Sequence, residues 1–156
     1  MSLASWWFNK IISGDDEDLS KYILQASFDD RLKSDEGFLS AAGDLAALTA
    51  ASGKDLYLTA AKVVFFANTN SSGTADEVVI KINGTVVETV KNSWLGGSGS
   101  GEYTLDYEFK NMGHKVEATQ VMKLELISIG AATDVEGFIQ AIEVPTGENP
   151  TTYANP

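Results

Sequence analysis

The sequence offers few side chains that could carry out catalysis. It contains one histidine, His114, and no cysteine, which excludes a thiolate nucleophile, a disulfide and a cysteine-ligated metal site. Hydrolysis by a serine or threonine would need His114 as its general base. Because residues 111–115 form a polar segment typical of a turn between strands, we interpret His114 as a solvated residue.

The glycine-rich run at residues 96–101 is a second segment that suggests chemistry. A phosphate-binding loop needs a helix after its glycines, because the amides of a helix N-terminus hold the phosphate. Residues 103–109 alternate like a strand instead, and Glu102 stands where the dinucleotide-binding pattern requires glycine. We therefore interpret the run as a loop between strands.

Acidic residues are abundant, with 22 Asp plus Glu against 11 Lys plus Arg. A glycosidase would need two carboxylates that face each other across a cleft, whereas Asp106 and Glu108 share the polar face of one predicted strand. The acidic residues 15–18 lack the spacing of a calcium loop, so we interpret them as a helix start. The sequence thus predicts no catalytic, metal-binding or cofactor-binding residue, and we expect a protein that is not an enzyme.

Aromatic and aliphatic residues near the N-terminus are the strongest candidates for binding a partner. They recur from Leu3 to Ile11 at the three- and four-residue spacing of one helical face. A helix this short is marginal alone, so its rings must pack on the body of the protein, a neighbouring subunit or another partner. Trp94 stands beside the glycine-rich run, where an interface role is as reasonable as burial. The predicted partner-binding residues are Leu3, Trp6, Trp7, Phe8, Ile11 and Trp94.

The charge and hydropathy patterns limit the partners and the location. A net charge of −11 repels phosphate backbones and anionic lipid, so we expect neither nucleic acid nor a membrane as the partner. The first ten residues lack a basic region followed by an apolar stretch, and therefore do not resemble a secretory signal. We expect a soluble chain.

The pattern of the chain changes near residue 36. It predicts a short helical N-terminal arm over residues 1–36, a β domain over residues 37–145 and a flexible polar tail over residues 146–156. The firmest local prediction is a hairpin at Asn83-Gly84, because this pair supplies the two positive φ angles of a type I′ turn. Strands are predicted around residues 38–39, 45–48, 56–66, 78–82, 86–90, 103–109, 116–129 and 135–144.

Strands without long helices between them favour antiparallel pairing. Seven or eight such strands predict an all-β protein, an antiparallel β-sandwich of jelly-roll type. Within residues 103–109, the period of two places Tyr103 and Tyr107 on one face. We expect these rings to pack in the core, and an exposed aromatic platform that also includes Trp94 is the alternative.

Three segments resemble jelly-roll virion accessory proteins, the head, spike or fibre domains of phages and viruses. Residues 53–59 read Gly-Lys-Asp-Leu-Tyr-Leu-Thr, residues 78–90 form a strand–Asn-Gly–strand hairpin, and residues 135–144 begin Val-Glu-Gly-Phe. The likeness covers about residues 37–144 and includes no catalytic residue. It implies a protein that coats, decorates or extends a particle as a homo-oligomer in contact with other virion or capsid proteins. It also implies assembly in the host cytoplasm and location in the virion.

The sequence therefore predicts a noncatalytic structural or adhesive virion component, such as a capsid, decoration or fibre protein, that acts through self-assembly and docking. Two alternatives come from other classes. A carbohydrate-binding β-sandwich module would bind a glycan through an exposed aromatic strip that includes Trp94. A small hydrolase would need His114 beside a hydroxyl group, or two carboxylates across a cleft.

Overall fold

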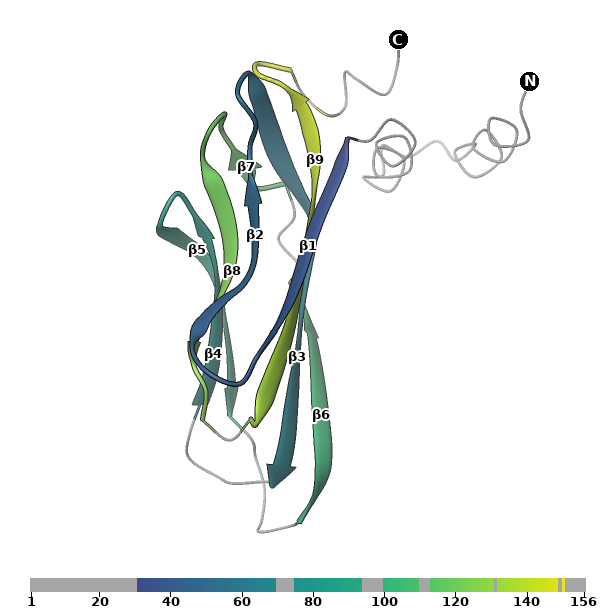
Figure 1. The fold of residues 1–156 in the computed structure, drawn as a ribbon, viewed down its shortest axis with the longest axis vertical. Coiled ribbons are helices and arrows are strands. Elements are labelled where there is room, and N and C mark those ends of the chain that lie inside the picture. The colour runs from purple at the N-terminus through teal and green to yellow at the C-terminus, as the bar shows by residue number, and fades with distance from the viewer. Residues whose placement is uncertain are drawn as a thin grey trace, which may run out of the picture.

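The computed structural model describes residues 31–69, 75–93, 100–109, 113–130, 132–148 and 150. These residues form two antiparallel β-sheets that face each other (Figure 1), which confirms the predicted all-β sandwich. The strands are β1 (Leu32–Leu39), β2 (Gly43–Thr49), β3 (Lys54–Thr69), β4 (Ala75–Ile82), β5 (Thr85–Ser93), β6 (Ser100–Glu108), β7 (Lys115–Val116), β8 (Val121–Ser128) and β9 (Asp134–Pro145).

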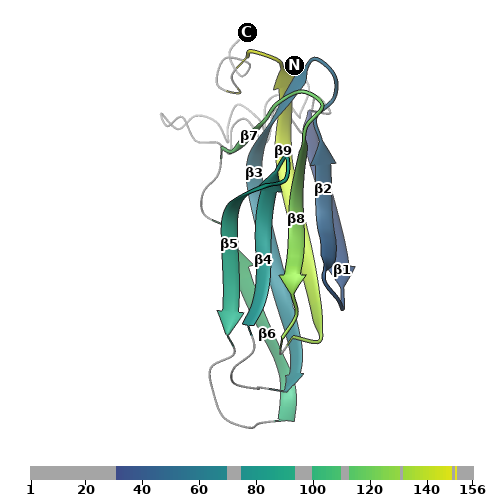
Figure 2. The ribbon, with the colours of Figure 1, turned by 90° about the vertical axis from the view of Figure 1, so that its left-hand side faces the viewer.

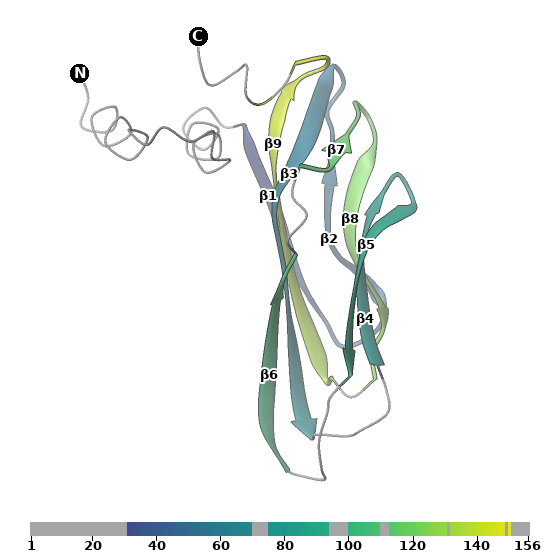
Figure 3. The ribbon, with the colours of Figure 1, turned by 180° about the vertical axis from the view of Figure 1, so that it is seen from behind.

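The strand order of the two sheets follows a nested pattern. Sheet A has the order β1-β9-β3-β6, with the two-residue β7 beside β3, and sheet B has the order β2-β8-β4-β5 (Figures 2 and 3). Strand β4 pairs with β5, β3 with β6, β2 with β8 and β1 with β9, all antiparallel. The pairing is therefore that of one long antiparallel hairpin with β4 and β5 at its tip, and successive strand pairs of this hairpin alternate between the two sheets.

The β4–β5 hairpin has the predicted turn. Asn83 has a φ of 47° and Gly84 a φ of 82°, so both central residues have the positive angles that a type I′ turn requires. Val78 pairs with Val90 in the ladder below this turn. The prediction from the Asn-Gly pair is confirmed.

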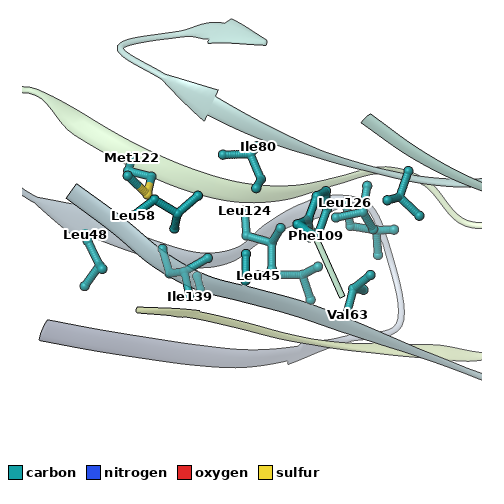
Figure 4. Close-up of a cluster of buried hydrophobic side chains, with 14 of the residues drawn as sticks. Leu45, Leu48, Leu58, Val63, Ile80, Phe109, Met122, Leu124, Leu126 and Ile139 are labelled. Atoms are coloured by element: carbon teal, nitrogen blue, oxygen red, sulfur yellow. The ribbon is translucent and has the colours of Figure 1, made fainter. Parts of the chain in front are cut away.

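The core lies between the sheets (Figure 4) and depends on a bulge in β3. Leu56 and Leu58 face sheet B, and so do Ala61 and Val63. In a regular strand the even-numbered and the odd-numbered residues would point to opposite faces. The register of β3 against β9 shifts between Leu58 and Ala60, which turns the second half of the strand by one residue. The Thr59 hydroxyl at this shift donates to the Gln140 carbonyl at 3.1 Å.

Three boundaries differ from the sequence analysis. Strand β1 begins at Leu32, inside the range expected to be the helical arm, and residues 1–30 lie outside the described residues. The segment expected to run from residue 116 to 129 is two strands, separated by a turn in which Thr119 has a φ of 70°. The predicted tail begins with contacts to the body, because the Thr146 amide donates to the Gly53 carbonyl at 3.0 Å.

Candidate partner-binding surface

The residues predicted to bind a partner are not placed by the structure. Leu3, Trp6, Trp7, Phe8, Ile11 and Trp94 all lie outside the described residues. Their role in binding remains a prediction. The described residues nevertheless contain apolar surfaces that could receive a partner, and these lie mainly on sheet A.

The outer face of sheet A carries three phenylalanines. A Cβ added to Gly37 or Gly137 would point at Leu45 of sheet B, so both glycines face the core. Their chain neighbours Phe38 and Phe138 therefore face outward, because successive residues of a strand alternate. Phe66 faces outward for the same reason, since Phe65 is fully buried in the core.

These phenylalanines lie on the neighbouring strands β1, β9 and β3. Phe38 and Val64 both pair with Glu136, from opposite sides of β9. The ring centroids of Phe38 and Phe66 are 6.3 Å apart with planes inclined by 46°, an aromatic contact on the surface. We call the set Phe38, Val64, Phe66 and Phe138 the phenylalanine face.

The phenylalanine face is partly open to solvent. Phe38 is 60% exposed, the largest exposure among the large apolar residues of the described chain, while Val64, Phe66 and Phe138 are partly buried. The outer face of an antiparallel sandwich is usually polar. An exposed apolar cluster on such a face is typical of a surface that contacts another molecule.

Acidic side chains border the phenylalanine face. Glu36 pairs in register with Phe138, and Asp134 pairs with Phe66. Lys62 lies on the same face, and its ammonium group is 3.4 Å from the Asp106 carboxylate. Because this lysine is already paired, the border favours a partner that is apolar and cationic over one that is acidic.

The opposite end of this outer face is covered by the chain itself. Ile142 and Val144 lie an even number of residues after Phe138 and therefore face outward as Phe138 does. Both are nevertheless buried, with Leu32 and Tyr57 packed against them. The Tyr57 hydroxyl donates to the Glu148 carbonyl at 3.2 Å, so the chain after β9 turns back beside this cluster. Of the outer face that the described residues form, the Phe38 end is the more exposed one.

Sequence reasoning did not find the phenylalanine face, although β9 contains a signal for it. A half-solvated strand should alternate apolar and polar residues. In β9 the core positions include Val135, Ile139 and Ala141, but the outward positions are also apolar at Phe138, Ile142 and Val144. The strand therefore carries apolar residues on both faces, with Glu136 and Gln140 between those of the outer face.

A second apolar surface lies along β6, at the edge of sheet A that faces the β5 edge of sheet B (Figure 3). Leu105 and Tyr107 pair with the core residues Phe65 and Val63, yet each is 40% exposed. Tyr107, which was predicted to pack in the core, is therefore buried only in part, whereas Phe109 after the end of β6 is 1% exposed. The rings of Tyr107 and Phe109 make an edge contact with centroids 5.5 Å apart. The predicted core position of the Tyr103 side chain lies outside the described residues.

His114 connects the two sheets near this edge. Its backbone carbonyl accepts from the Leu58 amide of β3, and its Nε2 lies 3.3 Å from Glu88 Oε1 of β5. The side chain is 29% exposed, so it is less solvated than expected. Within the described part of the chain, Glu88 is the side-chain partner of the His114 ring, and this pair joins the two sheets. Glu88 is a carboxylate, so the pair is not the histidine–hydroxyl pair that a hydrolase would need.

Asp55 is a fully buried carboxylate with a structural role. It accepts hydrogen bonds from Lys115 Nζ at 3.0 Å and from the Ala118 and Gly147 amides at 3.2 and 3.4 Å. Burial raises its pKa, but these donors outweigh that effect and hold the pKa of Asp55 below its usual value. The same contact raises the pKa of Lys115. Asp55 thereby joins β3 to β7 and to the chain after β9.

Neither metal-binding clusters nor spanning helices are found in the described residues. No group of three or more His, Asp or Glu side chains in the described ranges could hold a metal ion. A search of the same ranges finds no helix long and apolar enough to cross a membrane.

Comparisons with known proteins find distant structural similarity only. No protein-family model matches the sequence, and no curated protein matches it. Among solved structures, the chain is similar to the CBM36-1 domain of a multidomain xylanase from the hindgut metagenome of Trinervitermes trinervoides. The two are 14% identical with a TM-score of 0.30, over 76% of this chain and 99% of that domain. A likeness at this level carries no conclusion about binding or activity.

Proposed function

We propose that this protein is a noncatalytic jelly-roll component of a virion or comparable particle, which acts by self-association and by docking to other particle proteins. The observation that carries the proposal is the nested pairing of β1 with β9, β2 with β8, β3 with β6 and β4 with β5. A two-sheet sandwich built from two Greek keys is the jelly roll, which occurs in viral capsid proteins and lectins.

The phenylalanine face supports association. Phe38 is 60% exposed within an apolar cluster, and burying such a ring on a partner would stabilise a contact by about 1–2 kcal/mol. The described polar clusters around Asp55 and His114 hold strands together. In this function residues 1–12 form a short helix whose apolar residues make the contacts between subunits, with Trp94 at a second contact.

Deletion of residues 1–12 tests the proposal. The shortened chain should still fold, because β1 begins at Leu32, and its far-ultraviolet circular dichroism should keep the β-sheet signal of the full chain. The full chain should form oligomers or particles in light scattering and negative-stain microscopy, and the shortened chain should be monomeric. A full chain that is monomeric at all accessible concentrations, or equal assembly by both chains, would contradict the proposal.

Glycan binding is a second candidate because of Tyr107. This ring is 40% exposed beside the equally exposed Leu105, on the edge strand β6. A flat aromatic ring can pack against the apolar face of a sugar. A glycan array probed with the full chain should then give signals that Tyr107→Ala and Trp94→Ala remove, whereas Ile127→Ala on sheet B should keep them.

A further inference from the structure

We propose that the phenylalanine face is the docking surface for residues 3–11 of a second copy of this chain. The inference rests on the proposed function, which assigns self-association to these N-terminal residues. It adds the receiving surface, sheet A at Phe38, Val64, Phe66 and Phe138. Three observations carry it: the apolar match, the charge match and the length of the connecting chain.

The two surfaces match in chemistry. The N-terminal segment presents two indole rings, one phenyl ring and two aliphatic side chains, and the face presents three phenyl rings and one valine. Aromatic rings that meet edge to face or offset gain attraction beyond the burial of their area. The residues in question are Leu3, Trp6, Trp7, Phe8 and Ile11 on the segment.

The charges of the two surfaces are complementary. Lys10 is the only charged side chain in residues 1–12, whereas Glu36 and Asp134 lie beside the face and Glu136 lies within it, between Phe38 and Val64. Two phenylalanine faces pressed together would instead bring acidic borders against each other, which is unfavourable. The next charged residues, Asp15 to Asp18, are all acidic, and repulsion from the same border confines docking to the residues that precede them.

The connecting chain is long enough for exchange between copies. Residues 12–31 separate the segment from β1, and these 20 residues can span about 65 Å when extended. From Leu32 to Phe38 the strand advances six residues, which is about 20 Å. The linker is therefore longer than the distance from the start of β1 to Phe38, and the proposed self-association assigns the docked segment to a second copy.

A substitution on the receiving surface gives the first test. In Phe38→Ser, sedimentation velocity of the full chain should show self-association weakened by about tenfold or more, since one large ring contact is lost. Ile127→Ser is the matched control, because Ile127 is 38% exposed on the outer side of sheet B. Thermal unfolding should show that both variants remain folded. Assembly of Phe38→Ser equal to that of the unsubstituted chain would overturn the inference.

Disulfide trapping gives the second test, and the lack of native cysteine makes it specific. Separately tagged Ser5→Cys and Glu36→Cys chains, mixed under mild oxidation, should form mixed dimers that carry both tags. A mixture of Ser5→Cys with Ile127→Cys should form few. In a chain with both Ser5→Cys and Glu36→Cys, the link should join different chains, and a link within one chain would overturn the assignment to a second copy.

Self-association and the receiving surface can be tested separately. If the full chain never self-associates, the proposed function fails. If the chain assembles through residues 1–12 but neither Phe38→Ser nor the mixed disulfide has the expected effect, only the receiving surface is wrong.

Discussion

Gly37 and Gly137 lie directly opposite each other in the β1–β9 pair, and both face Leu45 of β2. A Cβ on Gly37 would stand 1.9 Å from the Leu45 carbonyl oxygen, and one on Gly137 would stand 2.9 Å from the Leu45 Cβ. No real Cβ tolerates such distances. The pair of glycines thus lets β2 cross sheet A in direct backbone contact.

Gly37→Ala should lower the free energy of unfolding by about 2–3 kcal/mol, because a backbone carbonyl cannot move away as a side chain can. Denaturant titration followed by far-ultraviolet circular dichroism measures the effect. Gly43→Ala is the matched control, since its Cβ would meet only the Leu39 Cδ1 at 3.3 Å, the far end of a flexible side chain. Equal losses in both variants would show that the contact at Leu45 is unimportant.

Asp55 should make the stability depend on pH. Its folded-state pKa is lowered, so its contribution is complete above about pH 4, the usual carboxyl range, and is lost as the pH falls through the lower folded-state value. Asp55→Asn should reduce the free energy of unfolding by about 2–4 kcal/mol at pH 7, and the difference should shrink in acid. Urea titrations at a series of pH values measure it.

Asp106→Asn is the control for this experiment, because Asp106 is exposed and pairs with an exposed Lys62. Exposed ion pairs contribute little to stability. Asp106→Asn should therefore follow the unsubstituted protein at every pH. A difference between Asp55→Asn and the unsubstituted protein that stays constant down to pH 2 would contradict the assignment.

Asp35 should protect the exposed edge of sheet B. Its carboxylate accepts a hydrogen bond from the Ala47 amide of the edge strand β2 at 2.7 Å. Unpaired edge strands promote association by strand pairing, and a charge at the edge opposes it. Asp35→Ala should lower the free energy of unfolding by about 1 kcal/mol and speed aggregation on heating, measured by static light scattering. Ser34→Ala should do neither.

Gly84→Ala tests the β4–β5 turn. At a φ of 82° a Cβ costs about 1–2 kcal/mol, and the loss should appear in denaturant titration. Asn83→Gly should be tolerated, since glycine adopts the φ of 47° at that position readily. Destabilisation of the same size in both variants would mean that the turn is not of the predicted type.

Local features of the sequence predicted much of the fold. The Asn83-Gly84 turn needs two positive φ angles that few dipeptides supply, so its position could be assigned from two residues. The period-two pattern of residues 122–126 likewise indicated which side chains of β8 enter the core. Antiparallel pairing followed from the short connections between strands.

The available surface could not be predicted in the same way, because tertiary contacts decide it. The bulge at Thr59 determines whether Phe65 or Phe66 faces the core, and the contact of Gly37 with Leu45 determines the direction of Phe38. The pairing of His114 with Glu88 joins residues on different sheets, and no local sequence pattern predicts it. The sequence analysis treated Phe38 only as part of a strand.

The nested strand order also affects when the molecule can be completed. Among the described strands, β1 pairs within its sheet with β9 alone, and β9 is synthesised after the other eight. Until residue 145 has left the ribosome, β1 and the outward-facing Phe38 have no complete sheet to join. Pairing at this sequence separation is slow, on the order of milliseconds to seconds. A nascent chain therefore has no finished docking surface until β9 has been synthesised.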